Sequence, residues 1–337
     1  MTIGLDETVV SRGWVHARGA HLVQIERAGI LAHEICARGA AAHVVAIFER
    51  SFYLRAREIF LCVGEPAIGN GPLTLLAGAG VRLSDLDLRP DEPAVISEQE
   101  IIIGERLRLC LDACEVWGPP AWPDAAPPDV LSETCGALAR RVDAASAGLA
   151  PVAFGAPVPT PLARTASECI AQFRCWLIEQ TVGWAKARSS RHAHADQRMV
   201  GTLRFAHPTG ESGRSKSALA AVCDLIGLGP GLTPSGDDFL AGALAALDAF
   251  GAAEACAALA HAIMLTLPGR TSPLSACLLR ASCAGHVSER LHDAVSALLV
   301  GDVEASTEAA ESIGHTSGWD MLAGAGVVIL RLLPKGG

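Results

Sequence analysis

The chain has 337 residues, which is long enough for two domains, and half of its residues are apolar. Its formal net charge of −9 and its scattered arginines exclude the basic face that nucleic-acid-binding proteins usually carry. No apolar run is long enough to span a membrane, and the first residues lack the pattern of a signal peptide. Eleven cysteines without C-x-x-C or zinc spacing indicate reduced, buried thiols, so we expect a cytoplasmic protein.

Residues 1–116 are predicted to form a strand-rich domain. In "SFYLRAR", Phe52, Leu54 and Ala56 alternate with residues of the opposite face, and "ERLRLCL" repeats this pattern at 105–111. A period of two is typical of half-buried antiparallel strands. The segments "AHVVAIF" and "EIFLCVG" are predicted as further strands, and "GEPAIGNGPL" as a loop that contains Asn70.

Five prolines in "VWGPPAWPDAAPP" predict a linker at 117–129, because proline interrupts both helices and sheets. Residues 130–337 then change to a helical period. Amphipathic spacing predicts a helix around 162–177, and Ala/Leu-rich segments predict helices near 211–226, 236–250, 252–266, 273–284, 286–299 and 319–333. The expected fold class is α+β, with a strand-rich N-terminal domain and a helical C-terminal domain. Only "MVGTLRFA" interrupts the helical part as a weak strand signal.

The stretch "GLGPGLTPSGDDFLAGAL", residues 227–244, carries the clearest functional signal. Glycines before a helix let backbone N–H groups turn toward a ligand, and a helix N-terminus favours an anion. We therefore consider Gly229, Gly231, Thr233 and Ser235 candidate ligands of a phosphate or a carboxylate. Asp237 is a candidate acceptor for a substrate N–H group, and together with Asp238 a candidate ligand for Mg²⁺.

A second stretch repeats the first. "SGDDFLAGA" at 235–243 and "SGWDMLAGA" at 317–325 share seven of nine residues, and each follows a Gly-x-Thr. This similarity predicts two helix starts built alike, related by an approximate two-fold axis. A purely structural explanation is also available, because Ser235 with Asp238 and Ser317 with Asp320 have the capping-box spacing. Such caps leave Gly229, Gly231 and Asp237 unexplained.

A third polar helix start is predicted at "LPGRTSPLSACLLRA", with Thr271 or Ser272 as the cap and Pro273 as the first helical residue. The segment is either a plain capped helix or an anion site in which Arg270 binds a carboxylate in a bidentate manner. His315, between Gly314 and Thr316, is a candidate proton donor or acceptor. "RHAHAD" at 191–196 is more typical of a solvated loop than of a metal site.

The candidate catalytic residues are therefore Asp237, Arg270 and His315. The candidate anion-binding residues are Asn70, Gly229, Gly231, Thr233, Ser235, Thr271, Ser272, Thr316 and Ser317. Such a composite site requires three helix starts, far apart in sequence, to lie within about 15 Å of one another, which is roughly the span of a small-ligand pocket.

The segments "GLGPGLTPSGDDFLAG", "RTSPLSACLLRASCAG" and "GHTSGWDMLAG", with "RSFYLR" and "NGP" upstream, resemble the AllH family of allantoin-degradation operons. The resemblance implies a multi-subunit enzyme with FdrA-like and AllG-like partners, linked to oxamate carbamoyltransferase. In that reaction oxalurate and phosphate give oxamate and carbamoyl phosphate. Carbamoyl transfer needs a phosphate site and a donor to the carbamoyl oxygen, which the glycine loop is suited to supply.

Two other interpretations remain open from the sequence. The chain is either a non-catalytic assembly or regulatory subunit, whose glycine loop docks a partner, or a free-standing Mg²⁺-dependent enzyme acting on a small carboxylate or phosphorylated substrate. A low aromatic content argues mildly against a large interface, because interface hot spots are rich in aromatic residues.

Overall fold

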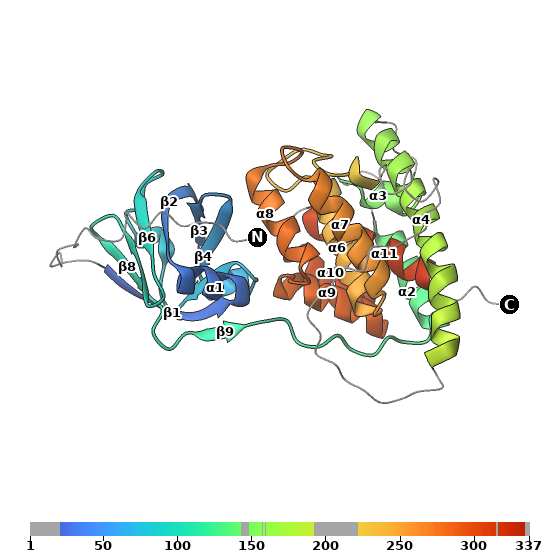
Figure 1. Cartoon of the computed structure of the whole chain (residues 1–337), viewed down its shortest axis with the longest axis horizontal. Coiled ribbons are helices and arrows are strands. Elements are labelled where there is room, and N and C mark those ends of the chain that lie inside the picture. The colour runs from blue at the N-terminus through green and yellow to red at the C-terminus, as the bar shows by residue number, and fades with distance from the viewer. Residues whose placement is uncertain are drawn as a thin grey trace. The chain divides into compact units, whose positions relative to one another are not determined.

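The structure, a computed structural model, describes residues 21–142, 148–156, 158, 160–191, 222–314 and 316–333, with side chains omitted for 181–191. The chain divides into two compact units between Pro119 and Pro120. The N-terminal unit is rich in strands and the C-terminal unit is helical (Figure 1). The expected α+β class, with a helical C-terminal part, is confirmed.

The described strands of the N-terminal unit form one nine-stranded sheet. They are β1 (His21–Gly29), β2 (Ala40–Ile47), β3 (Ser51–Ala56), β4 (Ile59–Gly64), β5 (Thr74–Ala77), β6 (Pro93–Ile96), β7 (Glu100–Ile103), β8 (Leu107–Cys110) and β9 (Glu115–Trp117). Their order is β5-β4-β3-β2-β6-β7-β8-β1-β9, and β1 also pairs with β5. This extra pairing closes the sheet on itself from β5 to β1, and β9 is added at one side of β1.

The alternation read from the sequence decides which residues enter this core. Phe52, Leu54 and Ala56 of β3 are buried, as are Leu107 and Leu109 of β8. The antiparallel pairings β2–β3, β3–β4 and β7–β8 agree with the expectation. The parallel pairs of β1 with β8 and β9, the helix α1 (Ile30–Arg38) and the short turns η2 (Pro66–Ile68) and η3 (Leu83–Asp85) were not predicted.

The proline-rich segment is extended and packs on the helical unit. The Trp122 indole N–H donates to the carboxylate of Asp248 at 2.8 Å, and the indole stacks on the His292 ring with centroids 4.2 Å apart. His292 Nε2 lies 3.0 Å from the carbonyl oxygen of Pro120. These contacts hold the first residues of the helical unit against its surface.

The helical unit contains helices of very different lengths. They are α2 (Pro128–Arg141), α3 (Ala150–Ala153), α4 (Pro161–Arg191), α6 (Ser235–Ala249), α7 (Ala253–Thr266), α8 (Pro273–Cys283), α9 (Glu289–Val300), α10 (Val303–Glu311) and α11 (Ser317–Leu332). Five helices predicted from residue 236 onward are present within a few residues of their expected bounds. No helix among the described residues is long and apolar enough to cross a membrane.

Three predicted segments lie wholly or partly outside the residues that the structure describes. "MVGTLRFA", "RHAHAD" and the helix expected at 211–226 lie largely within 192–221, outside the described residues; Val222 and Cys223 are helical. All eleven cysteines are described, and no disulfide joins any of them; six are buried and Cys175 is exposed.

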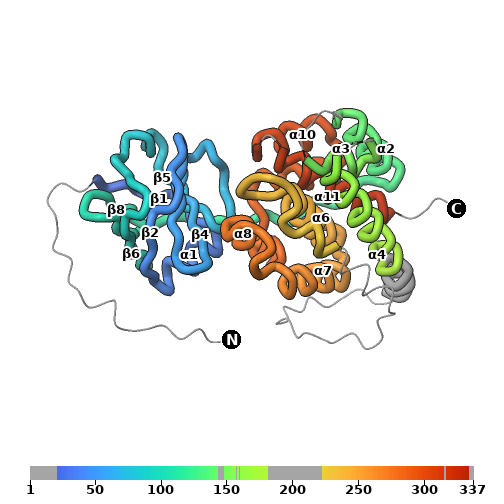
Figure 2. Tube along the Cα trace, turned by 90° about the horizontal axis from the view of Figure 1, so that it is seen from above, coloured from blue at the N-terminus to red at the C-terminus, as the bar shows by residue number. Residues whose placement is uncertain are grey.

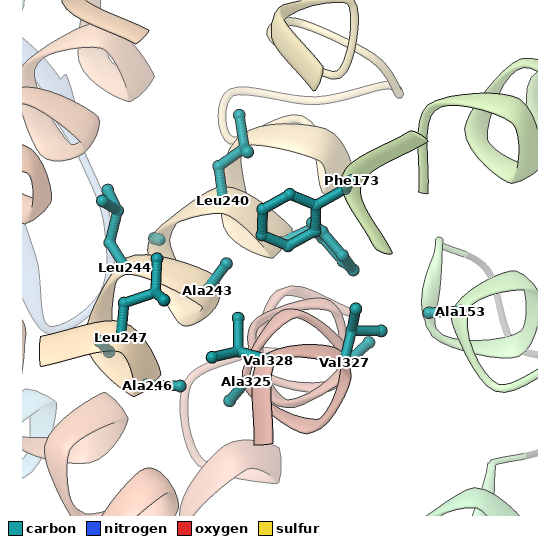
Figure 3. Packing of buried hydrophobic residues seen from close by; sticks show 14 of the residues in the cluster. Ala153, Phe173, Leu240, Ala243, Leu244, Ala246, Leu247, Ala325, Val327 and Val328 are labelled. Atoms are coloured by element: carbon teal, nitrogen blue, oxygen red, sulfur yellow. The ribbon is translucent and has the colours of Figure 1, made fainter. Parts of the chain in front are cut away.

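Helices α6 and α11 form the centre of the helical unit, lying side by side in Figures 1 and 2. Residues 235–247 of α6 are all buried. Figure 3 shows Ala243 and Ala246 of α6 gathered with Ala325 and Val328 of α11, and Phe173 of α4 nearby. These small side chains let the two helix backbones approach closely.

The close approach is reciprocal. A Cβ atom on Gly242 would lie 1.8 Å from the carbonyl oxygen of Met321, and one on Gly324 would lie 2.0 Å from that of Phe239. In the internal repeat, Gly242 corresponds to Gly324 and Phe239 to Met321. Each copy therefore makes the same contact with the other, as the expected two-fold relation requires.

Candidate functional site

The start of α6 is tied to the start of α8 by one buried carboxylate. Asp237 is 3% exposed, and its Oδ1 accepts the Gly227 N–H at 2.8 Å. Its Oδ2 accepts the Ser275 hydroxyl at 2.6 Å and the Thr271 hydroxyl as well. Both oxygens of Asp237 are therefore engaged by donors of the protein, which makes this residue a structural tie between the glycine loop and α8.

A second contact joins the same two elements, and a third reaches α11. The Ser272 hydroxyl donates to the carbonyl oxygen of Leu232 at 2.5 Å. The hydroxyl oxygens of Thr233 and Ser317 lie 3.3 Å apart, so the glycine loop also contacts the start of α11. The starts of α6, α8 and α11 thus converge within hydrogen-bonding distance, as the composite site requires.

The glycine loop between them is partly exposed and has unpaired backbone N–H groups among the described residues. Gly227, Gly229 and Gly231 have positive φ angles of 78°, 119° and 98°, which are accessible mainly to glycine. Residues 230–232 are exposed, with Leu232 at 58%. The N–H groups of Gly229, Gly231, Leu232 and Thr233 have no hydrogen-bond partner within the described ranges. A Cβ atom on Gly229 would lie 2.9 Å from the Ser235 nitrogen. The glycine loop therefore offers donors beside a helix N-terminus.

The expected capping boxes at the starts of α6 and α11 are wrong. The N-cap residues are Pro234 and Thr316, and neither makes a side-chain cap hydrogen bond. Ser235 and Ser317 are the first helical residues, and their hydroxyls lie beside the aspartate of the other repeat copy, Ser235 by Asp320 and Ser317 by Asp238. The cap of α8 is confirmed, because Ser272 accepts from the Ser275 N–H at 3.0 Å.

Asp320 is fully buried and anchors the start of α3. Its Oδ1 accepts the N–H groups of Leu149 at 2.5 Å and of Ala150 at 3.0 Å. A Cβ atom on Gly148 would lie 2.6 Å from that oxygen, so only glycine leaves room for the carboxylate. Sequence reasoning missed this partner; "GLAP" at 148–151, a glycine followed by a proline in the first helical turn, is the signal that points to it.

Asp238 and Asp320 each have one buried carboxyl oxygen without a partner among the described residues, and of the two only Asp320 accepts from backbone N–H groups. Asp238 is 5% exposed, and the oxygen concerned is its Oδ2. Burial raises its pKa to about 8; the Ser317 and Thr233 hydroxyls oppose this shift, and the charges of Asp320 and Asp237 reinforce it. Burial likewise raises the pKa of Asp320 to about 6, against the lowering effect of Ser235 and of the two backbone N–H groups.

The remaining candidates are Arg270, Asn70, Thr316 and His315. Arg270 pairs with Asp224 at 3.0 Å and its side chain is 42% exposed, so it lies at the rim of the α8 start. Asn70 is buried in the N-terminal unit, and nothing places it beside the helix starts. Thr316 is half-buried at the start of α11, and His315 lies outside the described residues.

The donor set does not fit the magnesium site considered from the sequence. Asp237 accepts three protein donors, and burial favours the uncharged form of Asp238. Among the described residues, no group of three or more His, Cys, Asp or Glu side chains is arranged to hold a metal ion. Asp237 and Asp238 are therefore not suited to hold Mg²⁺.

Residues 225–329 match the family model described as oxamate carbamoyltransferase subunit AllH. The expected resemblance to AllH is thereby confirmed over this range, which includes the glycine loop and the starts of α6, α8 and α11. No curated protein and no solved structure matches the chain.

Proposed function

We propose that the chain is an AllH-like subunit of a carbamoyltransferase-type enzyme and that its glycine loop, Gly229–Thr233, binds phosphate or the phosphate end of carbamoyl phosphate. The observation that carries this proposal is the convergence of three helix starts around a loop whose N–H groups have no partner among the described residues, inside the region that matches AllH. The proposal includes FdrA-like and AllG-like partner subunits and a cytoplasmic location, which the eleven free cysteines favour.

The physics of the site supports an anionic ligand. Each helix N-terminus carries a partial positive charge from its aligned peptide dipoles, so three of them at one place reinforce one another. The Thr233 hydroxyl and the N–H groups of the glycine loop add hydrogen bonds, which are stronger to a charged acceptor than to a neutral one. A phosphate or a small carboxylate is the ligand type that uses all of these donors.

In carbamoyl transfer, a phosphate oxygen forms a bond to the carbamoyl carbon of the donor. The bond from that carbon to the nitrogen of the oxamate moiety breaks, and the proton lost by phosphate passes to this nitrogen. We assign this chain the holding of the phosphate and the stabilisation of charge on the carbamoyl oxygen by the donors of the glycine loop. His315 is proposed as the group that moves the proton.

Two candidate residues receive more limited roles in this proposal. Asp237 positions the glycine loop against α8, because its oxygens already hold Gly227, Thr271 and Ser275. While phosphate occupies the glycine loop, Arg270 is exposed enough to exchange Asp224 for a carboxylate of the carbamoyl donor, because surface ion pairs are weak, typically about 0–1 kcal/mol. Ser272 and Thr271 fix the start of α8 beside the loop.

The test is calorimetric binding of phosphate to the full-length chain and to two glycine variants. Gly229→Ala places a Cβ atom 2.9 Å from the Ser235 nitrogen and covers this N–H, so phosphate affinity should fall about tenfold or more. Gly251→Ala is the matched control, because Gly251 also has a positive φ, lies at the other end of α6 and has open space around its Cβ position. We expect it to bind phosphate as the wild type does.

Absence of phosphate binding to the folded wild-type chain would contradict the proposal. The glycine loop would then be better explained as a docking element for a partner subunit, which its exposed Leu232 would suit. An equal loss in both glycine variants would point to general strain rather than to a phosphate site.

A further inference from the structure

We infer that Asp238 is the specificity-determining residue that recognises a primary carboxamide or carbamoyl group of the ligand, one hydrogen-bonded layer beneath the loop that holds the anionic end. This inference rests on the proposed function and deepens it, because it assigns the uncharged end of the ligand to one carboxyl group. It replaces Asp237, which sequence reasoning favoured as the acceptor of a substrate N–H group.

Asp238 has an unused carboxyl oxygen, whereas both oxygens of its neighbour Asp237 are engaged. Asp237 accepts one N–H and two hydroxyl donors from the protein itself. Asp238 Oδ2 and Asp320 Oδ2 are both buried without a partner among the described residues, but Asp320 receives two backbone N–H groups on its other oxygen and Asp238 receives none. A buried polar atom without a partner is costly, by roughly 1–3 kcal/mol, so its persistence requires an explanation such as a ligand.

The two copies of the repeat differ in the donors that surround their shared aspartate. Asp320, the counterpart of Asp238, receives two backbone N–H groups on Oδ1, from Leu149 and Ala150. No hydrogen bond from a backbone N–H group to the Asp238 carboxyl occurs within the described ranges; it faces the hydroxyls of Thr233 and Ser317. Asp320 therefore has protein N–H donors, whereas Asp238 has the two hydroxyls and the exposed glycine loop nearby. A ligand N–H group is the chemical equivalent of the donors that are missing there.

An uncharged Asp238 carboxyl group is chemically complementary to a primary carboxamide. An uncharged carboxyl group places an O–H donor beside a C=O acceptor. A primary carboxamide places an N–H donor beside a C=O acceptor, so the two groups pair through two hydrogen bonds in a ring. Burial, with Asp237 and Asp320 nearby, keeps the pKa of Asp238 high enough for the uncharged form at neutral pH. A second carboxylate on the ligand would offer no N–H group to this pair.

A ligand can reach Asp238 through the contact between Thr233 and Ser317. Asp238 lies beneath Thr233 and Ser317, whose hydroxyl contact is long, at 3.3 Å. Pro230, Gly231 and Leu232 are exposed, and a Cβ atom on Gly231 would meet nothing within 4 Å. Opening the Thr233–Ser317 contact therefore displaces little packed structure. A ligand with its anionic end on the glycine loop would place a neighbouring carboxamide between these two hydroxyls.

The experiment compares oxamate with oxalate, two ligands of similar size that differ by a carboxamide in place of a carboxylate. Calorimetry on the wild-type chain at pH 7 should give a preference for oxamate of about tenfold or more. Asp238→Ala should remove this preference by weakening oxamate and not oxalate. Asp238→Asn should keep the preference, because the side-chain amide also presents an N–H group beside a C=O group.

Thermal unfolding of each variant identifies any that fails to fold, and Asp238→Asn, which keeps the size of the side chain, maintains the test if Asp238→Ala does not fold. A folded Asp238→Ala chain that still prefers oxamate would overturn the inference, as would a folded Asp238→Asn chain that has lost the preference. Phosphate binding separates the two claims. If Asp238→Ala keeps phosphate and the oxamate preference, this inference fails and the proposed function stands, whereas a wild-type chain that binds no phosphate, oxamate or oxalate overturns both.

Discussion

Asp238 and Asp320 are two buried carboxyl groups on helices packed against each other. Asp238 faces the charges of Asp320 from α11 and Asp237 from its own helix, and burial is the largest cause of its raised pKa. Asp320 is stabilised by two backbone N–H groups and still has a raised pKa. The pair therefore retains protons in the folded chain that it would lose in the unfolded chain, and this links folding to pH.

The sign of this linkage is definite. A carboxyl group whose folded-state pKa is raised makes the folded chain bind more protons than the unfolded chain, so its contribution to the free energy of unfolding falls as pH rises. The fall begins near the unfolded value of about 3.9. It levels off near pH 6 for Asp320 and near pH 8 for Asp238. Asp238→Asn should remove the larger part of this decrease in the free energy of unfolding, because the pKa of Asp238 is raised further than that of Asp320.

Urea unfolding at pH 5, 6, 7 and 8 measures this effect. The free energy of unfolding of Asp238→Asn minus that of the wild type should increase at each step up to about pH 8. The same difference for Asp320→Asn, whose side chain still accepts from Leu149 and Ala150, should stop increasing near pH 6. A difference for Asp238→Asn that is independent of pH would mean that this carboxyl is ionised throughout.

Helices α6 and α11 depend on glycine at their crossing. Gly242→Ala would bring a Cβ atom to 1.8 Å from the Met321 carbonyl oxygen, which belongs to the backbone and cannot rotate away. Overpacking of this kind costs roughly 1–3 kcal/mol. We expect Gly242→Ala to lower the free energy of unfolding by that amount, measured by urea unfolding.

The matched control for this substitution is Gly136→Ala in α2. Its Cβ atom would meet only the end of the Arg140 side chain, at 3.5 Å. Alanine has a better helix propensity than glycine, by about 0.8–1.0 kcal/mol, so Gly136→Ala should stabilise the chain or leave it unchanged. Equal effects of the two substitutions would contradict the close α6–α11 contact.

At the scale of elements, the sequence predicted most helices and the shared plan of α6 and α11, because seven identities in nine residues are visible without a structure. It predicted capping boxes incorrectly, because spacing alone cannot distinguish a serine that caps its own helix from one that faces another helix. The pairing of Asp320 with Leu149 and Ala150 joins residues 171 and 170 positions apart, and no local pattern encodes such a contact.

At the scale of the whole chain, the division into a strand-rich and a helical unit follows from periodicity and the proline-rich segment. The closure of the sheet through β1 and β5 could not be predicted from these patterns, because register between distant strands is set by tertiary packing. The convergence of three helix starts was a requirement of the predicted site, and the structure meets it through Asp237, Ser272 and Ser317.

The central claim is that the start of α6 binds a small ligand with an anionic end and a carboxamide end. A crystal structure of the full-length chain with oxamate tests it most directly. With no phosphate present to occupy the glycine loop, we predict the carboxylate within hydrogen-bonding distance of the N–H groups of Gly231–Thr233, and the carboxamide paired with Asp238 after the Thr233–Ser317 contact has opened. Oxamate bound elsewhere, or an empty glycine loop at saturating oxamate, would contradict the account.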